Sequence, residues 1–261
     1  MEHVKYILLF IILLIGLYTL ITYISKYVTK RKLVAVLKTA AEMQKIGDLS
    51  GALEHLETNL NVFSFKDPIF ASYISFLIAN QKYDKAKKII KETIENPKEE
   101  FAAVNMLGYL ATIEEDFSTA EQQYLRALEL DPSKKKAIYT NLAVIYAEQG
   151  IKLDKAADML NEVLSIEDGA NKYPVYVNLG YVLYKKKQFE DALINEKIGL
   201  ELIPKGETFD SIRAFAHFII GLILKNQNKK SEARPELLIA RQLVRNPKFR
   251  IKIQKELSEL S

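Results

Sequence analysis

The fold is indicated most clearly by residues 101–134, FAAVNMLGYLATIEEDFSTAEQQYLRALELDPSK. Its two small residues, Gly108 and Ala120, each lie among large apolar side chains, and the acidic cluster at 114–116 separates the two segments. A small residue late in one helix and another early in the next allow two helix backbones to approach closely. The stretch therefore predicts a helix, a turn and a second helix packed against the first.

The same arrangement recurs along the chain, and a fixed period indicates a repeat architecture. Alanines early in the second helices follow one another at steps of 34 to 41 residues: Ala52, Ala86, Ala120, Ala156, Ala192 and Ala233. A helical hairpin of this size cannot bury its apolar face alone, so stacked neighbours complete a common core. We predict repeats near 33–66, 67–100, 101–134, 136–170, 173–206 and 214–247, followed by a C-terminal capping helix over 248–261.

The residue types at fixed positions in 101–134 and 173–206 resemble the tetratricopeptide repeat. The matching positions are Leu107, Gly108, Ala120, Tyr124, Ala127 and Pro132 in the first stretch, and Tyr176, Leu179, Gly180, Ala192, Gly199 and Pro204 in the second. The resemblance covers about residues 33–247. It implies an all-α fold, a right-handed α-solenoid of about six helix-turn-helix repeats, which here follows one transmembrane helix. Glu196 departs from the family's aromatic or apolar preference, so we expect that seam to be looser or turned to solvent.

Residues 1–32 have the features of a membrane anchor with a basic flank. The uncharged run YILLFIILLIGLYTLITYIS, residues 6–25, is long enough as a helix to span about 30 Å of hydrocarbon. Basic residues follow the run and few precede it, so the positive-inside rule places the remaining chain in the cytoplasm. A cleaved signal peptide is the alternative, although its basic n-region, shorter apolar run and small-residue cleavage site are not clear here. We predict a single-pass membrane protein that contacts the lipid bilayer through residues 6–25.

Composition excludes several function classes. The chain has no cysteine, which excludes disulfides, thiolate zinc sites and iron–sulfur clusters. The first 32 residues account for the whole net charge of +4, so the remaining chain is neutral and nucleic acid is not an expected partner. The three histidines, His3, His55 and His217, lack metal-ligand spacing, and no phosphate loop or nucleophile elbow is present. We expect no cofactor, no metal and no enzymatic activity.

The family resemblance implies that the first helix of each repeat lines a concave groove through relative positions 2, 5, 6, 9, 12 and 13. Applied to the third, fourth and fifth repeats, it gives the candidate peptide-binding residues Asn105, Tyr109, Thr112, Thr140, Asn141, Val144, Val177, Asn178, Tyr181, Tyr184 and Lys185. Asparagine donates to and accepts from a peptide backbone, and tyrosine offers an apolar ring with a polar tip. The alternative is that the asparagines only tie helix to helix. Spacing does not predict that the cations Lys185 and Lys225 converge.

These features predict a membrane-anchored protein–protein interaction module that recruits or scaffolds a protein or peptide partner. A chaperone-tail adaptor is not expected, because the paired cations of the family's carboxylate clamp are missing from the corresponding groove positions. One alternative is a self-associating scaffold, a homo-oligomer built through the convex face or through Phe249, Ile253 and Leu257 of the terminal helix. Another is the same module facing outside the cytoplasm.

Overall fold

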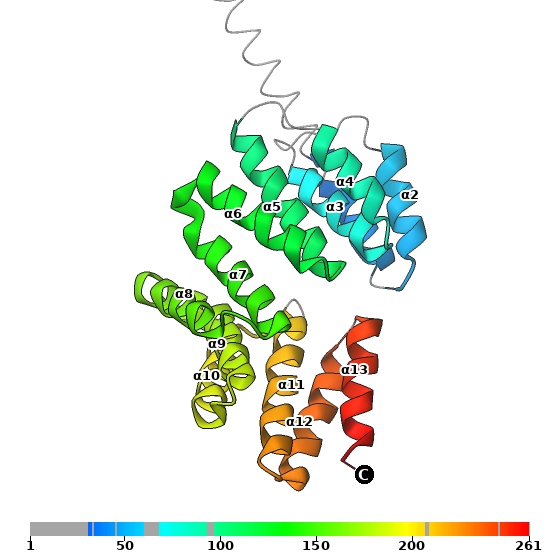
Figure 1. Ribbon diagram of the computed structural model, residues 1–261. Coiled ribbons are helices and arrows are strands. Elements are labelled where there is room, and N and C mark those ends of the chain that lie inside the picture. The colour runs from blue at the N-terminus through cyan, green and yellow to red at the C-terminus, as the bar shows by residue number, and fades with distance from the viewer. Residues whose placement is uncertain are drawn as a thin grey trace, which may run out of the picture. The chain divides into compact units, whose positions relative to one another are not determined.

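The computed structural model describes residues 31–32, 34–44, 46–59, 68–92, 97–206, 209–244 and 246–260. These residues form helices and turns, with no strand among them (Figure 1). No helix in these ranges is both long and apolar enough to cross a bilayer. The predicted span at 6–25 lies outside the described residues. The chain divides into two compact units, residues 1–103 and 104–261, which are described one at a time.

The described part of the N-terminal unit consists of short helices with apolar inner faces. After the helical residues 34–44 come α2 (Leu49–Asn59), α3 (Pro68–Ala79), α4 (Tyr83–Glu92) and the start of α5 (Pro97–Ile113). The buried side chains include Ala40, Ala52, Leu56, Phe70, Tyr73, Leu77, Ala86 and Ile90. The Glu57 carboxylate joins neighbouring repeats, because it accepts hydrogen bonds from the Tyr73 hydroxyl at 3.1 Å and from Lys85 at 2.8 Å.

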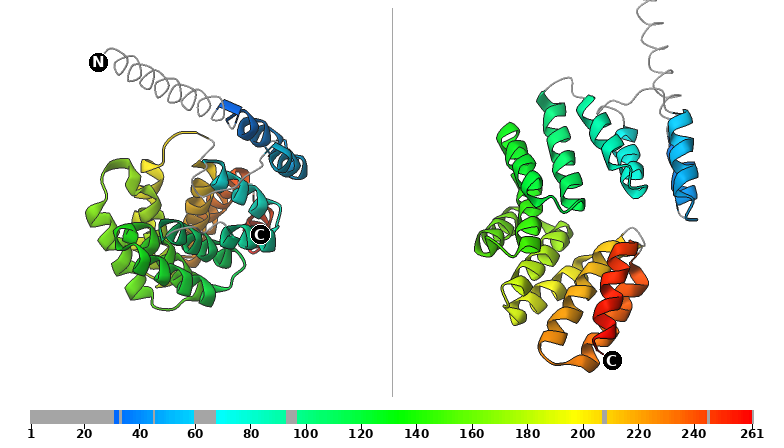
Figure 2. Two further views of the ribbon diagram at one scale, coloured as in Figure 1. Left: turned by 90° about the horizontal axis from the view of Figure 1, so that it is seen from above. Right: turned by 45° about the vertical axis from the view of Figure 1, so that its right-hand side comes forward.

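The C-terminal unit is built from successive helical hairpins. After α5 come α6 (Phe117–Leu130), the 3-10 turn η1 (Pro132–Lys134), α7 (Lys135–Gln149) and α8 (Leu153–Ile166). The turn η2 (Gly169–Lys172) leads into α9 (Tyr173–Lys185), α10 (Phe189–Leu202), α11 (Asp210–Asn226), α12 (Lys230–Leu243) and α13 (Pro247–Ser258). The hairpins are α7–α8, α9–α10 and α11–α12, and the first helices α7, α9 and α11 also contact one another in sequence. Figure 2 shows the orange and red helices α11, α12 and α13 packed side by side.

A residue with positive φ closes the turn between the two helices of each predicted repeat. These residues are Gly47, Gln81, Glu115, Lys187 and Asn228, together with both Gly150 and Lys152 in the fourth repeat, with φ between 48° and 88°. Left-handed backbone at the end of a helix reverses the chain tightly and satisfies the last carbonyl groups. In five of the six turns a non-glycine residue adopts this conformation, at a modest local cost that the packed hairpin outweighs. The recurrence supports an all-α array of similar helix-turn-helix units.

Close helix approach depends on glycine in three hairpins of the C-terminal unit. A Cβ atom on Gly108 would lie 2.9 Å from the ring of Tyr124. On Gly221 it would lie 2.6 Å from Leu237, and on Gly180 it would lie 2.6 Å from the carboxyl group of Glu196. The small residue and its partner are 16 positions apart in each pair. The sequence therefore places a glycine where the two backbones come closest.

The expectation that Glu196 makes a looser or solvent-facing seam is wrong. Glu196 is fully buried against Gly180, and neither carboxyl oxygen has a hydrogen-bond partner in the part of the chain that the structure describes. Because burial penalises the charged form, it raises the pKa of Glu196 well above the ordinary value. The seam is closed around a buried carboxyl group whose neutral form is favoured by burial.

The terminal helix α13 packs against the unit through one apolar face. Ile253 and Leu257 are buried, and the Phe249 ring lies 5.1 Å from that of Phe218 in an edge-to-face contact. Asn246 begins the helix by accepting a hydrogen bond from the Phe249 amide at 3.0 Å. Ile251, which lies between Phe249 and Ile253 in the sequence, is 71% exposed. One side of α13 thus covers the array and the other faces outward.

Candidate functional site

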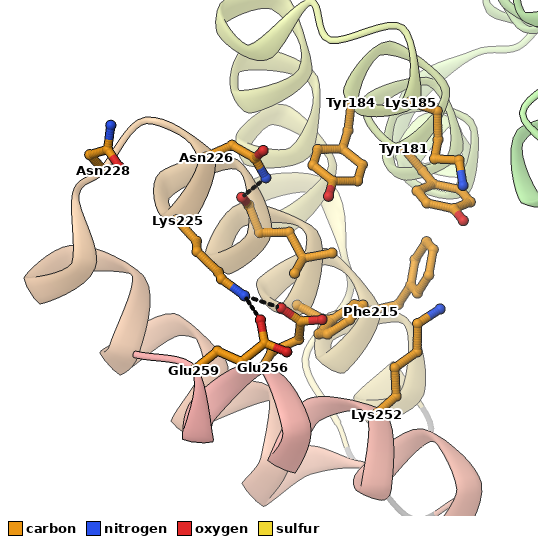
Figure 3. Close-up of a pocket in the computed structure, with 12 residues that line it drawn as sticks. Tyr181, Tyr184, Lys185, Phe215, Lys225, Asn226, Asn228, Lys252, Glu256 and Glu259 are labelled. Carbon is orange, nitrogen blue, oxygen red and sulfur yellow. Dashed lines mark hydrogen bonds and ion pairs between the residues drawn. The ribbon is translucent and has the colours of Figure 1, made fainter. Parts of the chain in front are cut away.

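A pocket of about 540 Å³ opens among the first helices at the end of the C-terminal unit (Figure 3). Helices α9, α11 and α13 and the turn after α11 supply its walls. The lining residues are Tyr181, Tyr184, Lys185, Phe215, Phe218, Leu222, Lys225, Asn226, Asn228, Lys252, Glu256 and Glu259. Its size suits one or a few side chains of a ligand.

Aromatic rings form the floor of the pocket. Tyr181 is 4% exposed, and its ring lies 5.2 Å from that of Phe215 in an edge-to-face contact with an interplanar angle of 77°. Phe218 is also buried and touches Phe249 from α13 in the same manner. Edge-to-face pairs fix ring orientation and add to the free energy gained from burial. These contacts orient the rings that lie beneath the pocket.

The tyrosine hydroxyl groups are held by neighbouring polar side chains. Burial raises the pKa of Tyr181, and the charge of Glu148 and its hydrogen bond with the hydroxyl raise this pKa further. Burial also raises the pKa of Tyr184, although a hydrogen bond from Asn226 opposes that shift. Both hydroxyls remain protonated at physiological pH. They can orient a ligand but cannot supply a phenolate.

Lys225 ties α11 to α13 across one side of the pocket. Its ammonium group donates to Glu256 at 2.7 Å and to Glu259 at 2.5 Å (Figure 3). Burial lowers the pKa of Lys225, but the hydrogen bonds to these two carboxylates outweigh burial, and the net shift is upward. The hydrogen bond from Lys225 lowers the pKa of Glu259. Lys225 and Glu259 are charged at neutral pH, and the two ion pairs join α11 to α13 at the pocket wall.

Two further lysines stand over aromatic rings. The Lys185 ammonium lies 5.7 Å from the centroid of the Tyr181 ring, and the Lys252 ammonium lies 5.7 Å from that of Phe218. These distances are in the range of cation–π attraction. In the described part of the chain, no ion pair of Lys185 or Lys252 with a carboxylate is found.

The structure brings together three of the predicted site residues, Tyr181, Tyr184 and Lys185. Lys225 lines the same pocket as Lys185, a convergence that spacing along the sequence does not predict. The reason is that α11 packs directly beside α9 and places the last turns of both helices at one pocket edge. Spacing within a single repeat carries no information about this lateral contact.

The predicted residues of the third and fourth repeats do not line this pocket. Tyr109 is 53% exposed, whereas the Thr112 and Thr140 hydroxyls donate to the carbonyl groups of Gly108 and Lys136, both at 2.9 Å. Half-buried positions are held by Asn105, Asn141, Val144 and Asn178.

Two of the predicted site residues, Asn105 and Val177, have side-chain atoms that are buried in the protein interior. The Asn105 Oδ1 atom is buried without a hydrogen-bond partner among the described residues. Val177 does not face a groove, because it is fully buried and fills the space left by Gly199. A Cβ atom on Gly199 would lie 2.6 Å from the Val177 side chain. Val177 is therefore a packing residue of the fifth repeat.

The other lining residues come from α11, the turn after it and α13, and among these sequence analysis named only Lys225, as a groove cation. Counted from 214, Phe215, Phe218, Leu222, Lys225 and Asn226 occupy relative positions 2, 5, 9, 12 and 13. Counted from 248, one repeat length later, Lys252, Glu256 and Glu259 occupy positions 5, 9 and 12. The groove rule applied to the sixth repeat, and to the terminal helix as a further first helix, would have found them.

No arrangement for metal chemistry is found in the described ranges, where no three His, Cys, Asp or Glu side chains are grouped to hold an ion. The pocket instead offers an apolar floor, two amides and five charged groups. These features suit binding of a polar segment with an apolar anchor.

Comparison with known proteins agrees with the repeat architecture. Residues 101–134 match the family model of the tetratricopeptide repeat. No curated protein matches the sequence. The fold is similar to the crystal structure of the APC/C hetero-tetramer Cut9-Hcn1, with a TM-score of 0.60, 14% identity, and coverage of 87% of this chain and 42% of that chain. Yeast Tom70 gives a TM-score of 0.60 and 17% identity, with 87% of this chain and 46% of that chain covered.

The apo form of the quorum sensor NprR from B. thuringiensis is also similar, with a TM-score of 0.55, 19% identity, and coverage of 89% of this chain and 70% of that chain. At these identities the likenesses show the fold alone. The chain spans less than half the length of the Cut9-Hcn1 and Tom70 chains that it matches. Sequence and fold together support an array of the tetratricopeptide repeat type, matched by sequence at residues 101–134 and by fold over most of the chain.

Proposed function

We propose that this protein is a membrane-anchored interaction module that recruits a protein partner through the pocket formed by α9, α11 and α13. One observation carries the proposal: three successive first helices direct residues at the same relative positions into a single preformed pocket. In a repeat array the inner positions of the first helices form an extended binding surface. The aromatic floor supplies apolar area, and the charged rim supplies specificity.

Anchoring contributes to this function through effective concentration. The uncharged run at 6–25 would hold the array at a bilayer, and the basic residues that follow it would place the array on the cytoplasmic side. A partner confined near the same membrane meets the pocket at a high local concentration, so a weak contact suffices. Release of the full chain from membranes by alkaline carbonate would contradict the anchor.

Photo-crosslinking in native membranes tests recruitment. A photoreactive residue at Lys185 lies in the pocket, whereas one at Lys187 lies two residues away at an exposed turn and serves as the matched control. We expect a discrete adduct with another protein from position 185 and none from position 187. Equal adducts from both positions, or no adduct from position 185, would contradict recruitment through this pocket.

Self-association is the second candidate, and Ile251 favours it because a large apolar side chain is exposed on the outer face of α13. The residues expected to carry it do not face outward. Ile253 and Leu257 are buried, and Phe249 packs on the rings of α11. Substituting those three would damage the array itself, so Ile251→Ser is the informative variant. A lower oligomeric state of Ile251→Ser than of the wild-type protein would favour self-association.

A further inference from the structure

Positive charge is concentrated at the C-terminal end of the chain. Residues 225–261 contain ten Lys and Arg residues against four Glu, whereas residues 33–224 contain 22 Lys and Arg against 28 Asp and Glu. Three of the four glutamates already form an ion pair or a hydrogen bond with a side chain of α11. Few carboxylates therefore remain to balance the basic side chains on the outer surface of this end.

The outward face of α13 combines basic side chains with one large apolar side chain. Lys248, Ile251 and Lys255 lie three and four residues apart, so they share one side of the helix, and all three are exposed. No ion pair of Lys248 with a carboxylate is found in the part of the chain that the structure describes. The Glu259 carboxylate, which lies near Lys255, is already bound by Lys225.

The outer face of α12 continues this surface. Arg234, Leu238 and Arg241 are exposed, and they border a hollow of about 270 Å³ together with Gln254 and Ser258 of α13. The Arg241 guanidinium donates a hydrogen bond to the Gln254 side-chain oxygen at 3.0 Å, which joins the two helices, and these pack side by side (Figure 2). We name the combined surface the basic face, and it consists of Arg234, Leu238, Arg241, Lys248, Ile251 and Lys255.

An anionic lipid bilayer is complementary to the basic face in charge and in polarity. Each Lys or Arg near a negatively charged leaflet strengthens binding about fivefold. Apolar side chains among the cations enter the boundary between headgroups and acyl chains. Ile251 suits this role because it is 71% exposed beside Lys248 and Lys255, and Leu238 of α12 is exposed as well.

Two other occupants fit the basic face less well. A nucleic acid would pair its phosphates with the cations but offers no apolar layer to the exposed isoleucine. A second copy of the chain, packed face to face about a two-fold axis, would bring the same cations against one another. A bilayer supplies negative charge and an apolar layer together.

We propose that the basic face docks on the anionic surface of a lipid bilayer. None of its six residues lines the pocket of α9, α11 and α13, so docking and recruitment use different side chains. The docking goes beyond the recruitment function, because it gives the C-terminal unit a membrane contact of its own in addition to the anchor predicted at residues 6–25.

A fluorescent label at position 251 tests the docking. The chain has no cysteine, so Ile251→Cys gives the full-length protein a single site for an environment-sensitive nitrobenzoxadiazole label. The labelled protein is placed in nanodiscs of phosphatidylcholine alone or of an equal mixture with phosphatidylserine. We expect the label's emission to shift to shorter wavelength only where phosphatidylserine is present, and to shift back at high salt, which screens exposed charges.

Variants of charge and of label position supply matched controls. In the protein labelled at position 251, K248Q/K255Q should reduce the shift, because two cations of the basic face are lost. The variant K187Q/K197Q removes two exposed lysines from elsewhere in the same unit and should leave the shift unchanged. A label at Ile194→Cys, which replaces an exposed isoleucine of α10, should show no shift in either nanodisc. Thermal unfolding verifies that each variant folds.

The absence of a shift at position 251 with phosphatidylserine, or an equal shift in both kinds of nanodisc, would overturn docking on anionic lipid. A shift that depends on protein concentration and not on lipid would assign the face to a second copy, and one produced only by a single-stranded oligonucleotide would assign it to nucleic acid. Either result would overturn the lipid proposal. Failure of the anchor is distinguishable, because a chain released by alkaline carbonate would still sediment with phosphatidylserine vesicles through the basic face.

Discussion

In the third repeat Gly108 packs against the ring of Tyr124, whereas in the fifth repeat Gly180, at the corresponding place, faces the carboxyl group of Glu196. Both hairpins close, and both partners are buried. In both repeats the glycine allows the two helix backbones to come close together. The partner side chain determines how much the packed hairpin is stabilised. Tyr124 contributes apolar area, but Glu196 contributes a desolvated acid without a hydrogen bond.

The largest expected difference between the two seams is in pH dependence. The folded state holds the Glu196 proton to higher pH than the unfolded chain, because burial raises the pKa of this carboxyl in the fold. Between the two pKa values the folded state therefore binds more protons, and the free energy of unfolding falls as pH rises, by at most about 1.4 kcal/mol per pH unit. At pH values below the pKa of Glu196 in the unfolded chain, the carboxyl is protonated in both states, so Glu196 no longer makes the free energy of unfolding depend on pH.

Urea unfolding of the wild type and Glu196→Gln from pH 4 upward measures that slope. The Gln variant lacks the titrating group and should lose this part of the slope. An identical pH profile in both proteins would mean that the pKa of Glu196 is the same in the folded and the unfolded chain, which would contradict the effect of burial.

Replacement of Glu196 by leucine has the next largest expected effect. The sixth repeat shows that leucine fits this geometry, since Leu237 packs against Gly221 at the same spacing. Removing the unpaired buried carboxyl should raise the free energy of unfolding at pH 7 by about 1–3 kcal/mol. Chemical denaturation measures the change, and a loss of stability in Glu196→Leu would contradict the buried-acid account.

A smaller change in the free energy of unfolding is expected when Gly180 itself is replaced by a residue with a side chain. Gly180→Ala places a Cβ atom 2.6 Å from the Glu196 carboxyl group, so we expect a loss of about 1–2 kcal/mol from overpacking. Glu196→Ala should suppress most of that loss, whereas Tyr124→Ala in the third repeat should leave it unchanged. A double-mutant cycle gives the coupling, and zero coupling between positions 180 and 196 would show that the seam is open.

The smallest effect is expected at the tyrosine hydroxyl of the third repeat. Its oxygen lies 3.5 Å from the Thr112 hydroxyl, at the outer limit of a hydrogen bond. Tyr124→Phe should therefore change the free energy of unfolding by less than about 0.5 kcal/mol, because the ring that fills the seam is kept. A loss as large as that of an ordinary buried hydrogen bond would show a stronger contact than the structure has.

Sequence periodicity could predict the helical hairpins because it depends on local spacing, as at Gly108 and Ala120. Together with the groove positions that the family resemblance implies, it also found Tyr181, Tyr184 and Lys185, which share one face of α9 because they lie three and four residues apart. It could not predict the pocket, which arises from lateral packing of α9 beside α11 and from α13 acting as a further first helix. The burial of Glu196 was not predicted either. Glutamate is usually exposed to solvent, but this glutamate occupies a position of the repeat that lies in the interior.

The third and fifth repeats also differ in what they offer a partner, and this difference allows the most direct test of the account. Tyr109 of the third repeat is 53% exposed but lies outside the pocket, whereas Lys185 of the fifth repeat lines it. The decisive measurement is the yield of adducts in native membranes from photoreactive residues at these two positions. We expect a discrete partner adduct from position 185 and little from position 109. A partner captured from position 109 and not from position 185 would contradict recruitment through the pocket of α9, α11 and α13.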